Sequence, residues 1–195
     1  MTLDLTARTA WVFDLDGTLT VPMHDFGGLK AQLGLPADQD ILGGIAAAPA
    51  AEQARLLEAV RSWERDHVAN AAPDPNAAAL LDQLAARGCR LGILTRNTRS
   101  TALSTLASIG LLDRFDPEAV LGRDSAAPKP APDGVIALLA RWEAPPSTAV
   151  IVGDYVDDLR AGRTAGTAAV WLDHDGTGES SAEADRTIRA LGELL

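Results

Sequence analysis

The sequence predicts an α/β fold, a parallel sheet with helices on both faces and an inserted small α-helical cap. Short apolar segments that do not alternate with polar residues recur along the chain, which is typical of parallel strands buried on both faces. Helical patterns separate most of these segments, and such alternation predicts a parallel sheet with right-handed crossovers. The alternation breaks once, between Leu19 and Pro75, where helical patterns occur without a convincing strand.

Five apolar segments are expected to form the strands. The first is rich in residues that favour strands and leads directly into an Asp-Leu-Asp-Gly-Thr sequence. The third is the shortest, and the apolar character of the other three, which are five or six residues long, predicts buried strands. These segments are 9–13, 90–95, 119–121, 149–153 and 168–172.

Core helices are expected where apolar residues recur at helical spacing. Gly88, Gly110 and Gly166 each follow one such segment, and glycine readily adopts the left-handed conformation that ends a helix. The expected core helices are 76–87, 100–109, 133–142, 157–165 and 182–195.

The interval after the first strand is interpreted as the cap. Its helical segments are separated by glycine and proline, and Pro73-Asp-Pro75 forms the expected return linker. We therefore expect a core formed by 1–19 and 74–195, and a cap formed by 20–73. The expected cap helices are 26–33, 38–48 and 51–68.

The composition limits the class of protein. Apolar residues make up 47% and charged residues 23% of the 195 positions, so the chain is expected to be globular rather than disordered. No apolar run reaches the roughly 18 residues of a membrane span, and the first residues lack a secretory-signal pattern. The single cysteine, Cys89, excludes an intramolecular disulfide framework and favours a cytoplasmic location.

The charge limits the partners. A net charge of −10 argues against broad binding to nucleic acid or to an anionic membrane, because both require a basic surface. A small anionic substrate stays compatible with this charge, since one site can be locally positive on an acidic protein. The sequence leaves the oligomeric state, monomer or homodimer, open.

Polar residues follow the predicted strands at their carboxyl ends, where ligands of α/β sheets gather. Asp14 and Asp16 follow the first strand, Thr95 ends the second, and Asp154 follows the fourth. Lys129 lies in the loop after the third strand and adds a fixed positive charge. The glycine after Asp16 permits a turn, so that both aspartates can serve one site. Such an all-oxygen cluster predicts a Mg²⁺ site.

Four motifs contain these residues: Asp14-Leu-Asp-Gly-Thr-Leu19, Leu94-Thr95-Arg96-Asn97, Lys129-Pro-Ala-Pro132 and Gly153-Asp-Tyr-Val-Asp-Asp158. With them, the sequence resembles the haloacid dehalogenase superfamily, and within it the Mg²⁺-dependent phosphatases with a small helical cap. Its size and cap placement are similar to those of the phosphoglycolate-phosphatase-like group. The resemblance implies a Rossmann-like fold of this superfamily and hydrolysis of a small phosphorylated metabolite, a phosphate monoester, through an aspartyl-phosphate.

The resemblance also implies catalytic roles. Asp14 would be the nucleophile, and Asp16 would be the general acid and then the general base. Lys129 would neutralise the nucleophile and the transferred phosphoryl group. Mg²⁺ would be bound by Asp154, by the Asp14 carboxylate and by the Asp16 backbone carbonyl.

Substrate contacts are implied for the second motif. The Thr95 hydroxyl would bind a phosphoryl oxygen, assisted by the backbone N–H of Arg96 or Asn97. Thr18 is a further candidate for substrate binding. The Arg96 side chain would either face solvent or bind an acidic part of the substrate.

Several residues keep two interpretations. Asp158 or its neighbour Asp157 would contact Lys129 or a metal-bound water. His24 would contact substrate or lie at a surface hinge, and Trp63 would line a pocket or pack in the cap. His174 is expected to be solvated.

Other functions are weighed against the phosphatase. A phosphomutase of the same fold would return the phosphoryl group from Asp14 to a sugar. A phospho-acceptor signalling domain shares the Asp, Thr and Lys set around Mg²⁺ but lacks a cap and a second aspartate. A C–halogen hydrolase is disfavoured, because hydrolases of that type do not need the Asp16 position.

Overall fold

The chain forms two compact units in the computed structural model. The core unit consists of Met1–Pro22 and Ala71–Leu195, and the insert unit is Met23–Asn70. Each unit has buried apolar residues of its own, and the core unit contains the sheet. The structure describes residues 3–22, 26–39, 41–179 and 181–195.

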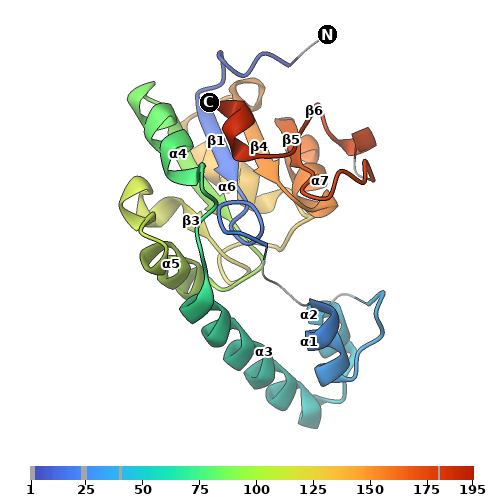
Figure 1. Ribbon diagram of the computed structural model, residues 1–195. Helices are drawn as coiled ribbons and strands as arrows, with labels where there is room; N and C mark the ends of the chain where they lie inside the picture. The colour runs from blue at the N-terminus through green and yellow to red at the C-terminus, as the bar shows by residue number, and fades with distance from the viewer. Residues whose placement is uncertain (1–2, 23–25, 40, 180) are drawn as a thin grey trace. The chain divides into compact units, whose positions relative to one another are not determined.

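Six parallel strands form the sheet, in the order β3-β2-β1-β4-β5-β6 (Figure 1). The first strand of the chain is therefore central, with β2 on one side and β4 on the other. This arrangement confirms the predicted α/β fold class. The strands are β1 (Ala10–Phe13), β2 (Arg90–Leu94), β3 (Val120–Leu121), β4 (Ala149–Gly153), β5 (Ala168–Leu172) and β6 (Arg186–Ile188).

Helices cover both faces of this sheet. The side chains of β1 are apolar on both faces, so both must be shielded from water. Trp11 and Phe13 belong to an apolar cluster with residues of α4 and α5, whereas Ala10 and Val12 belong to a cluster with residues of α6 and α7. Every residue of β1 is buried, which explains why its sequence does not alternate with polar residues. The helices are α4 (Ala77–Ala86), α5 (Arg99–Ser108), α6 (Asp133–Trp142) and α7 (Val156–Thr164).

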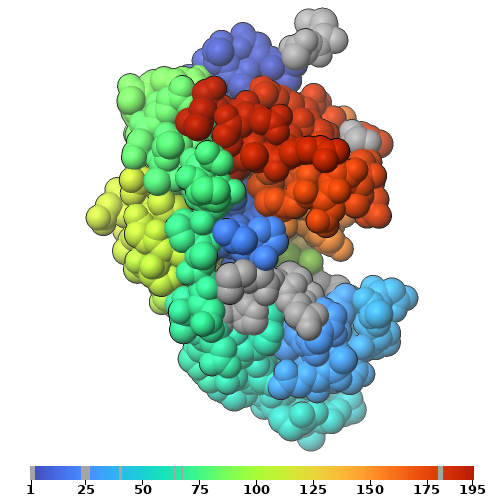
Figure 2. Space-filling model, viewed as in Figure 1, coloured from blue at the N-terminus to red at the C-terminus, as the bar shows by residue number. Residues whose placement is uncertain are grey.

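The predicted helix over 182–195 is wrong. The segment forms a three-residue edge strand, β6, between two short 3-10 turns, Ser181–Glu183 and Leu191–Leu194. β6 pairs with β5, and Ile188 is buried against the apolar cluster. The last turn packs against α4 and lies beside it at the surface (Figure 2). Three residues are too few to show a strand period, so pairing with the open edge of β5 decides this conformation.

The described part of the insert unit, residues 26–39 and 41–70, forms three helices: α1 (Phe26–Leu33), α2 (Ile41–Ala47) and α3 (Ala50–Asn70). Leu29, Leu56 and Val60 belong to its apolar cluster, and the partly buried Trp63 packs against this cluster. His24 lies outside the described residues. Across the described residues, no helix is both long and apolar enough to cross a membrane.

A short ladder closes the core unit where the insertion leaves and returns. Thr20 and Pro73 form an antiparallel bridge, the Val21 N–H donates to the Ala72 carbonyl at 2.9 Å, and the Asp74 N–H donates to the Leu19 carbonyl at 2.8 Å. These contacts attach the linkers to the core unit. The compact insert is therefore shorter at both ends than the interval 20–73.

The buried position of Ile188 gives a test of the sixth strand. We expect Ile188→Ala to lower the free energy of unfolding by about 2–3 kcal/mol, because a buried side chain is lost next to β5. Thr187→Ala, at an exposed position of the same strand, should change it by less than about 0.5 kcal/mol. Urea unfolding of both variants measures the difference, and equal effects would contradict the assignment of Ile188 to the core.

Candidate active site

The register of the central strands brings the predicted site residues to one edge of the sheet. Phe13 pairs with Ile93 of β2 and with Val152 of β4. The Asp14 N–H then donates to the Val152 carbonyl at 2.9 Å, so the pairing of β1 with β4 continues to Asp14. Thr95 and Asp154 directly follow β2 and β4, so all three side chains start at neighbouring strand ends.

Lys129 is a buried cation between two carboxylates. Its Nζ lies 2.5 Å from Asp14 Oδ1 and 2.5 Å from Asp158 Oδ1, and only 3% of its side chain is exposed. Burial by itself lowers the pKa of Lys129, but the charges of Asp14 and Asp158 and the hydrogen bonds to them raise that pKa above its usual value. The ammonium group therefore stays charged beside Asp14.

The structure distinguishes the two aspartates at the start of α7. Asp158 contacts Lys129, and its Oδ2 accepts a hydrogen bond from the Tyr155 N–H at 3.0 Å. Its side chain packs over Gly153, where any Cβ would collide with the carboxylate. Asp157 instead pairs with Arg96, with 3.5 Å between Oδ2 and Nη1. Asp158 is therefore the aspartate that contacts Lys129, whereas Asp157 contacts Arg96 of the second motif.

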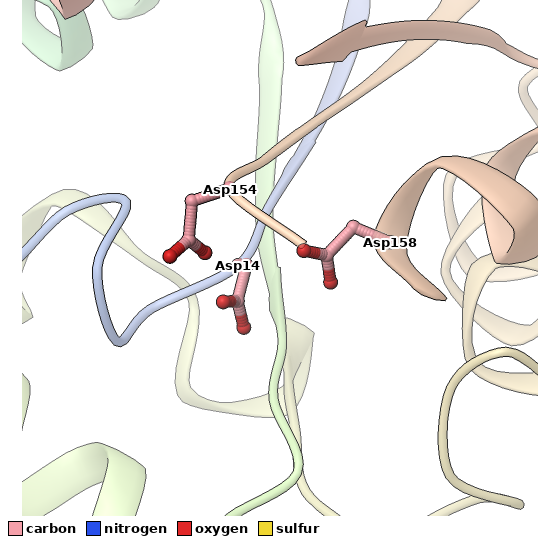
Figure 3. A group of neighbouring side chains, drawn as sticks. All are labelled: Asp14, Asp154 and Asp158. Atoms are coloured by element: carbon pink, nitrogen blue, oxygen red, sulfur yellow. The ribbon is translucent and has the colours of Figure 1, made fainter. Parts of the chain in front are cut away.

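Three carboxylates gather beside Lys129. One oxygen each of Asp14, Asp154 and Asp158 lies within 4.8 Å of the others, and Figure 3 shows the first two at strand ends and the third on α7. Burial raises the pKa of Asp14 well above its usual value; Lys129 opposes this shift, and the neighbouring aspartates add to it. Burial, followed by the charge of Asp158, raises the pKa of Asp154 to about 6.

This charge balance fits a divalent cation. When all three carboxylates are ionised, one ammonium group leaves two negative charges among buried groups, and one divalent ion would neutralise them and offset the raised pKa values of Asp14 and Asp154. The side-chain donors are all oxygens, which are the ligands that Mg²⁺ prefers. Asp14, Asp154 and Asp158 are thus the described side chains that could hold such an ion or its bound water.

The Asp16 side chain faces the second motif. Asp16 Oδ2 accepts a hydrogen bond from Asn97 Nδ2 at 2.7 Å and another from Thr95 Oγ1 at 3.4 Å. The Asn97 N–H donates to Thr95 Oγ1 at 3.2 Å. The structure therefore brings Asp16, Thr95 and Asn97 together, while Arg96 points to Asp157.

The turn after β1 is fitted closely around Asp154. Gly17 has a φ of +82°, and a Cβ there would collide with the Asp154 carboxylate. Glycine is therefore required by conformation and by space. The Thr18 hydroxyl donates to Asp154 Oδ1 at 3.3 Å, so Thr18 contacts a candidate metal ligand.

Two residues at the end of β5 were missed as site residues by sequence reasoning. Trp171 Nε1 donates to the Asp154 carbonyl at 3.3 Å, and His174 Nε2 lies 2.6 Å from the Gly17 carbonyl oxygen. His174 is exposed, as expected, and it also contacts the turn after β1, which the sequence did not indicate. Their place at the carboxyl end of a predicted strand is the one signal that the sequence offered.

Known proteins share sequence and fold with this chain. A family model described as haloacid dehalogenase-like hydrolase matches residues 9–166. The chain is 32% identical to the phosphoglycolate phosphatase of Rhodospirillum rubrum over 85% of this chain and 79% of that protein. It is 30% identical to "Probable phosphatase IndB" of Dickeya dadantii over 94% and 90% of the two chains. A haloacid dehalogenase-like hydrolase from Streptococcus pneumoniae shares the fold, with a TM-score of 0.78, 22% identity and 97% of each chain covered.

The raised pKa of Asp154 predicts a pH-dependent cost in the metal-free protein. Between the unfolded pKa of 3.8 and the folded pKa of about 6, the folded chain keeps a proton that the unfolded chain has released, so stability falls as the pH rises. We expect Asp154→Asn to stabilise the metal-free protein above this window by about 1–3 kcal/mol. The same variant should lose most of the stabilisation by Mg²⁺.

Thermal unfolding with EDTA and with Mg²⁺, above and below the raised pKa, measures both effects. Asp133→Asn, an exposed position on α6, is the matched control and should behave as the wild type. A metal-free Asp154→Asn variant that is less stable than the wild type above the window would contradict the prediction.

Proposed function

Since the chain belongs to the haloacid dehalogenase-like hydrolase family and is a phosphatase of that family, we propose that Asp14 is its nucleophile and that Mg²⁺ is its cofactor. The observation that carries this proposal is the position of Asp14, which is held at the end of the central strand by the Lys129 ammonium group, 2.5 Å away. A carboxylate beside a buried cation attacks in a fixed direction, and phosphoryl transfer depends mainly on positioning and on charge neutralisation.

In the first step, a carboxylate oxygen of Asp14 attacks phosphorus, and the P–O bond to the leaving group breaks. The product is an aspartyl-phosphate, and the leaving oxygen takes a proton from Asp16. Lys129 stays charged next to Asp14 and stabilises the negative charge on the transferred group.

In the second step, water attacks the same phosphorus and loses a proton to Asp16, while the bond from phosphorus to Asp14 breaks. Inorganic phosphate is released, and both aspartates return to their starting states. Asn97 and Thr95 orient the Asp16 carboxylate through their hydrogen bonds in the free protein. On substrate binding, we expect the Thr95 hydroxyl, the N–H groups of the second motif and Thr18 to contact the phosphoryl oxygens.

Mg²⁺ would be held by Asp14, by Asp154 and by the Asp16 backbone carbonyl, and it would neutralise charge on the phosphoryl oxygens. Asp158 would keep Lys129 in place and orient metal-bound water, with Asp157 as a further support through Arg96. The two uncompensated charges of the aspartate cluster support this cofactor.

The substrate that we propose is a small phosphorylated metabolite with a monoester group, used in the cytoplasm without a nucleic-acid or membrane partner. Phosphoglycolate is the first compound to test, because one relative is named phosphoglycolate phosphatase. Arg96 follows the phosphate-binding threonine, and its guanidinium group would be suited to a second anionic group of such a substrate. We propose that the interval 20–73, which contains the insert unit and the two linkers attached to the core unit, is the cap.

Replacing the nucleophile tests the reaction. We expect Asp14→Asn to lower kcat for p-nitrophenyl phosphate with Mg²⁺ by more than about 1000-fold, because the amide cannot form the covalent intermediate. The control Asp133→Asn should keep wild-type activity. A wild type that releases no phosphate from a broad panel of monoesters with Mg²⁺ would overturn the phosphatase proposal.

Asp16→Ala tests the acid–base role. We expect kcat to fall about 100-fold or more while KM changes little, because proton transfer contributes to the transition state and not to substrate binding. The loss should be smaller for esters with acidic leaving groups, which need less protonation. A loss of equal size for acidic and alkyl leaving groups would contradict the role of Asp16 as the general acid.

A further inference from the structure

The turn after β5 is a fixed structure that reaches the proposed active site. Asp173 is buried, and its N–H donates to the Ile188 carbonyl of β6 at 2.8 Å. Its two carboxylate oxygens accept hydrogen bonds from the N–H groups of Thr177 and Gly178, at 3.1 and 3.2 Å. Asp173 is therefore held by β6 through its backbone and by the following turn through its side chain, and this fixes the position from which His174 extends.

That residue, His174, is directed to the turn that follows β1. Its Nε2 lies 2.6 Å from the Gly17 carbonyl oxygen. A carbonyl oxygen only accepts hydrogen bonds, so Nε2 carries the hydrogen and donates, whether the imidazole is neutral or charged. The contact therefore does not depend on a particular charge state of His174.

Gly17 is a position where hydrogen bonds from other residues can restrict a flexible backbone. Glycine has the largest conformational freedom of all residues, and Gly17 uses a positive φ beside the Asp154 carboxylate. Its N–H donates to the Thr20 hydroxyl at 3.1 Å within the turn, and its carbonyl accepts from His174. Both polar groups of this flexible position are thus satisfied, and the second partner comes from a distant part of the chain.

The peptide that His174 holds connects the residues with proposed roles. Asp16 precedes Gly17, and Thr18 follows it and donates to Asp154 Oδ1 at 3.3 Å. The same end of β5 also supports the Asp154 backbone, because Trp171 Nε1 donates to its carbonyl at 3.3 Å. One strand end therefore supports both the turn after β1 and the residue after β4.

We propose that His174 is a positioning residue, whose hydrogen bond to the Gly17 carbonyl orients Asp16 and Thr18 for the reaction. The inference rests on the proposed function for the roles of Asp16 and of the Mg²⁺ site. His174 is exposed, so it contributes little to the core, and its effect should appear in turnover and metal binding rather than in folding.

Three variants test this proposal. His174→Ala removes the donor, and His174→Gln supplies an amide N–H that can take the place of Nε2. Asp175→Ala changes the exposed neighbouring residue and is the matched control. The measurements are kcat and KM for p-nitrophenyl phosphate, Mg²⁺ binding by calorimetry without substrate, and the thermal unfolding midpoint.

We expect His174→Ala to lower kcat and to weaken Mg²⁺ binding, each by about tenfold, as is usual when a residue that supports metal ligands is lost. KM should change less than kcat, because the substrate contacts expected from Thr95 and the N–H groups of the second motif do not depend on His174, although that of Thr18 does. His174→Gln should recover most of both losses, and Asp175→Ala should match the wild type. The unfolding midpoint of each variant should stay within about 2 °C.

Wild-type kcat and Mg²⁺ affinity in His174→Ala would overturn the proposal. A His174→Gln variant as impaired as His174→Ala, with unfolding midpoints lowered in parallel, would also overturn it and assign His174 a structural role. If the wild type itself hydrolyses no phosphate ester, the proposed function fails, and Mg²⁺ calorimetry of His174→Ala still decides whether His174 orients the metal site.

Discussion

The ion cluster of Lys129 between Asp14 and Asp158 is the constraint on which the rest of the site depends. An ammonium group with 3% of its side chain exposed has lost nearly all of its hydration, and only close carboxylates offset that loss. The cluster therefore fixes three separate parts of the chain: the end of β1, the loop after β3 and the first turn of α7. The Tyr155 N–H and the bare Gly153 backbone hold Asp158 in this arrangement.

The strand order explains why the cluster forms at this place. β1 lies between β2 and β4, so the chain reverses its direction of progress through the sheet beside β1. At such a point the loops on the two sides diverge and leave a crevice above the strand ends, which is where α/β proteins bind ligands. Asp14 and Asp154 start at this point, and their charges exceed what Lys129 neutralises. The strand order that places these aspartates together therefore also concentrates the negative charge that a cation would neutralise.

The sequence predicted what depends on short segments and missed what depends on distant contacts. Buried apolar strands such as 149–153 and the motifs at their ends are local signals, because both faces of a central strand are covered. β6 was missed because only the edge of β5 makes Arg186–Ile188 a strand. His174 was interpreted as solvated because its partner, Gly17, is 157 positions away. The sequence also leaves the alternative between Asp157 and Asp158 open, since adjacent residues of a helix face different neighbours and only the packing of α7 decides which one reaches Lys129.

The ladder at the base of the insertion separates the packing of the core unit from the packing of the insert unit. The bridge between Thr20 and Pro73 and the ladder beside it complete the core unit before the chain leaves it, and the insert has an apolar cluster of its own. Loop-closure entropy grows slowly with loop length, so an insertion at a closed base costs the core unit little. Substitutions in the insert therefore act on its own apolar cluster, whereas Lys129 and the aspartates belong to the core unit. By contrast, a change at Gly17, Gly153 or His174 acts directly on the geometry of the charged cluster and of the turn beside it.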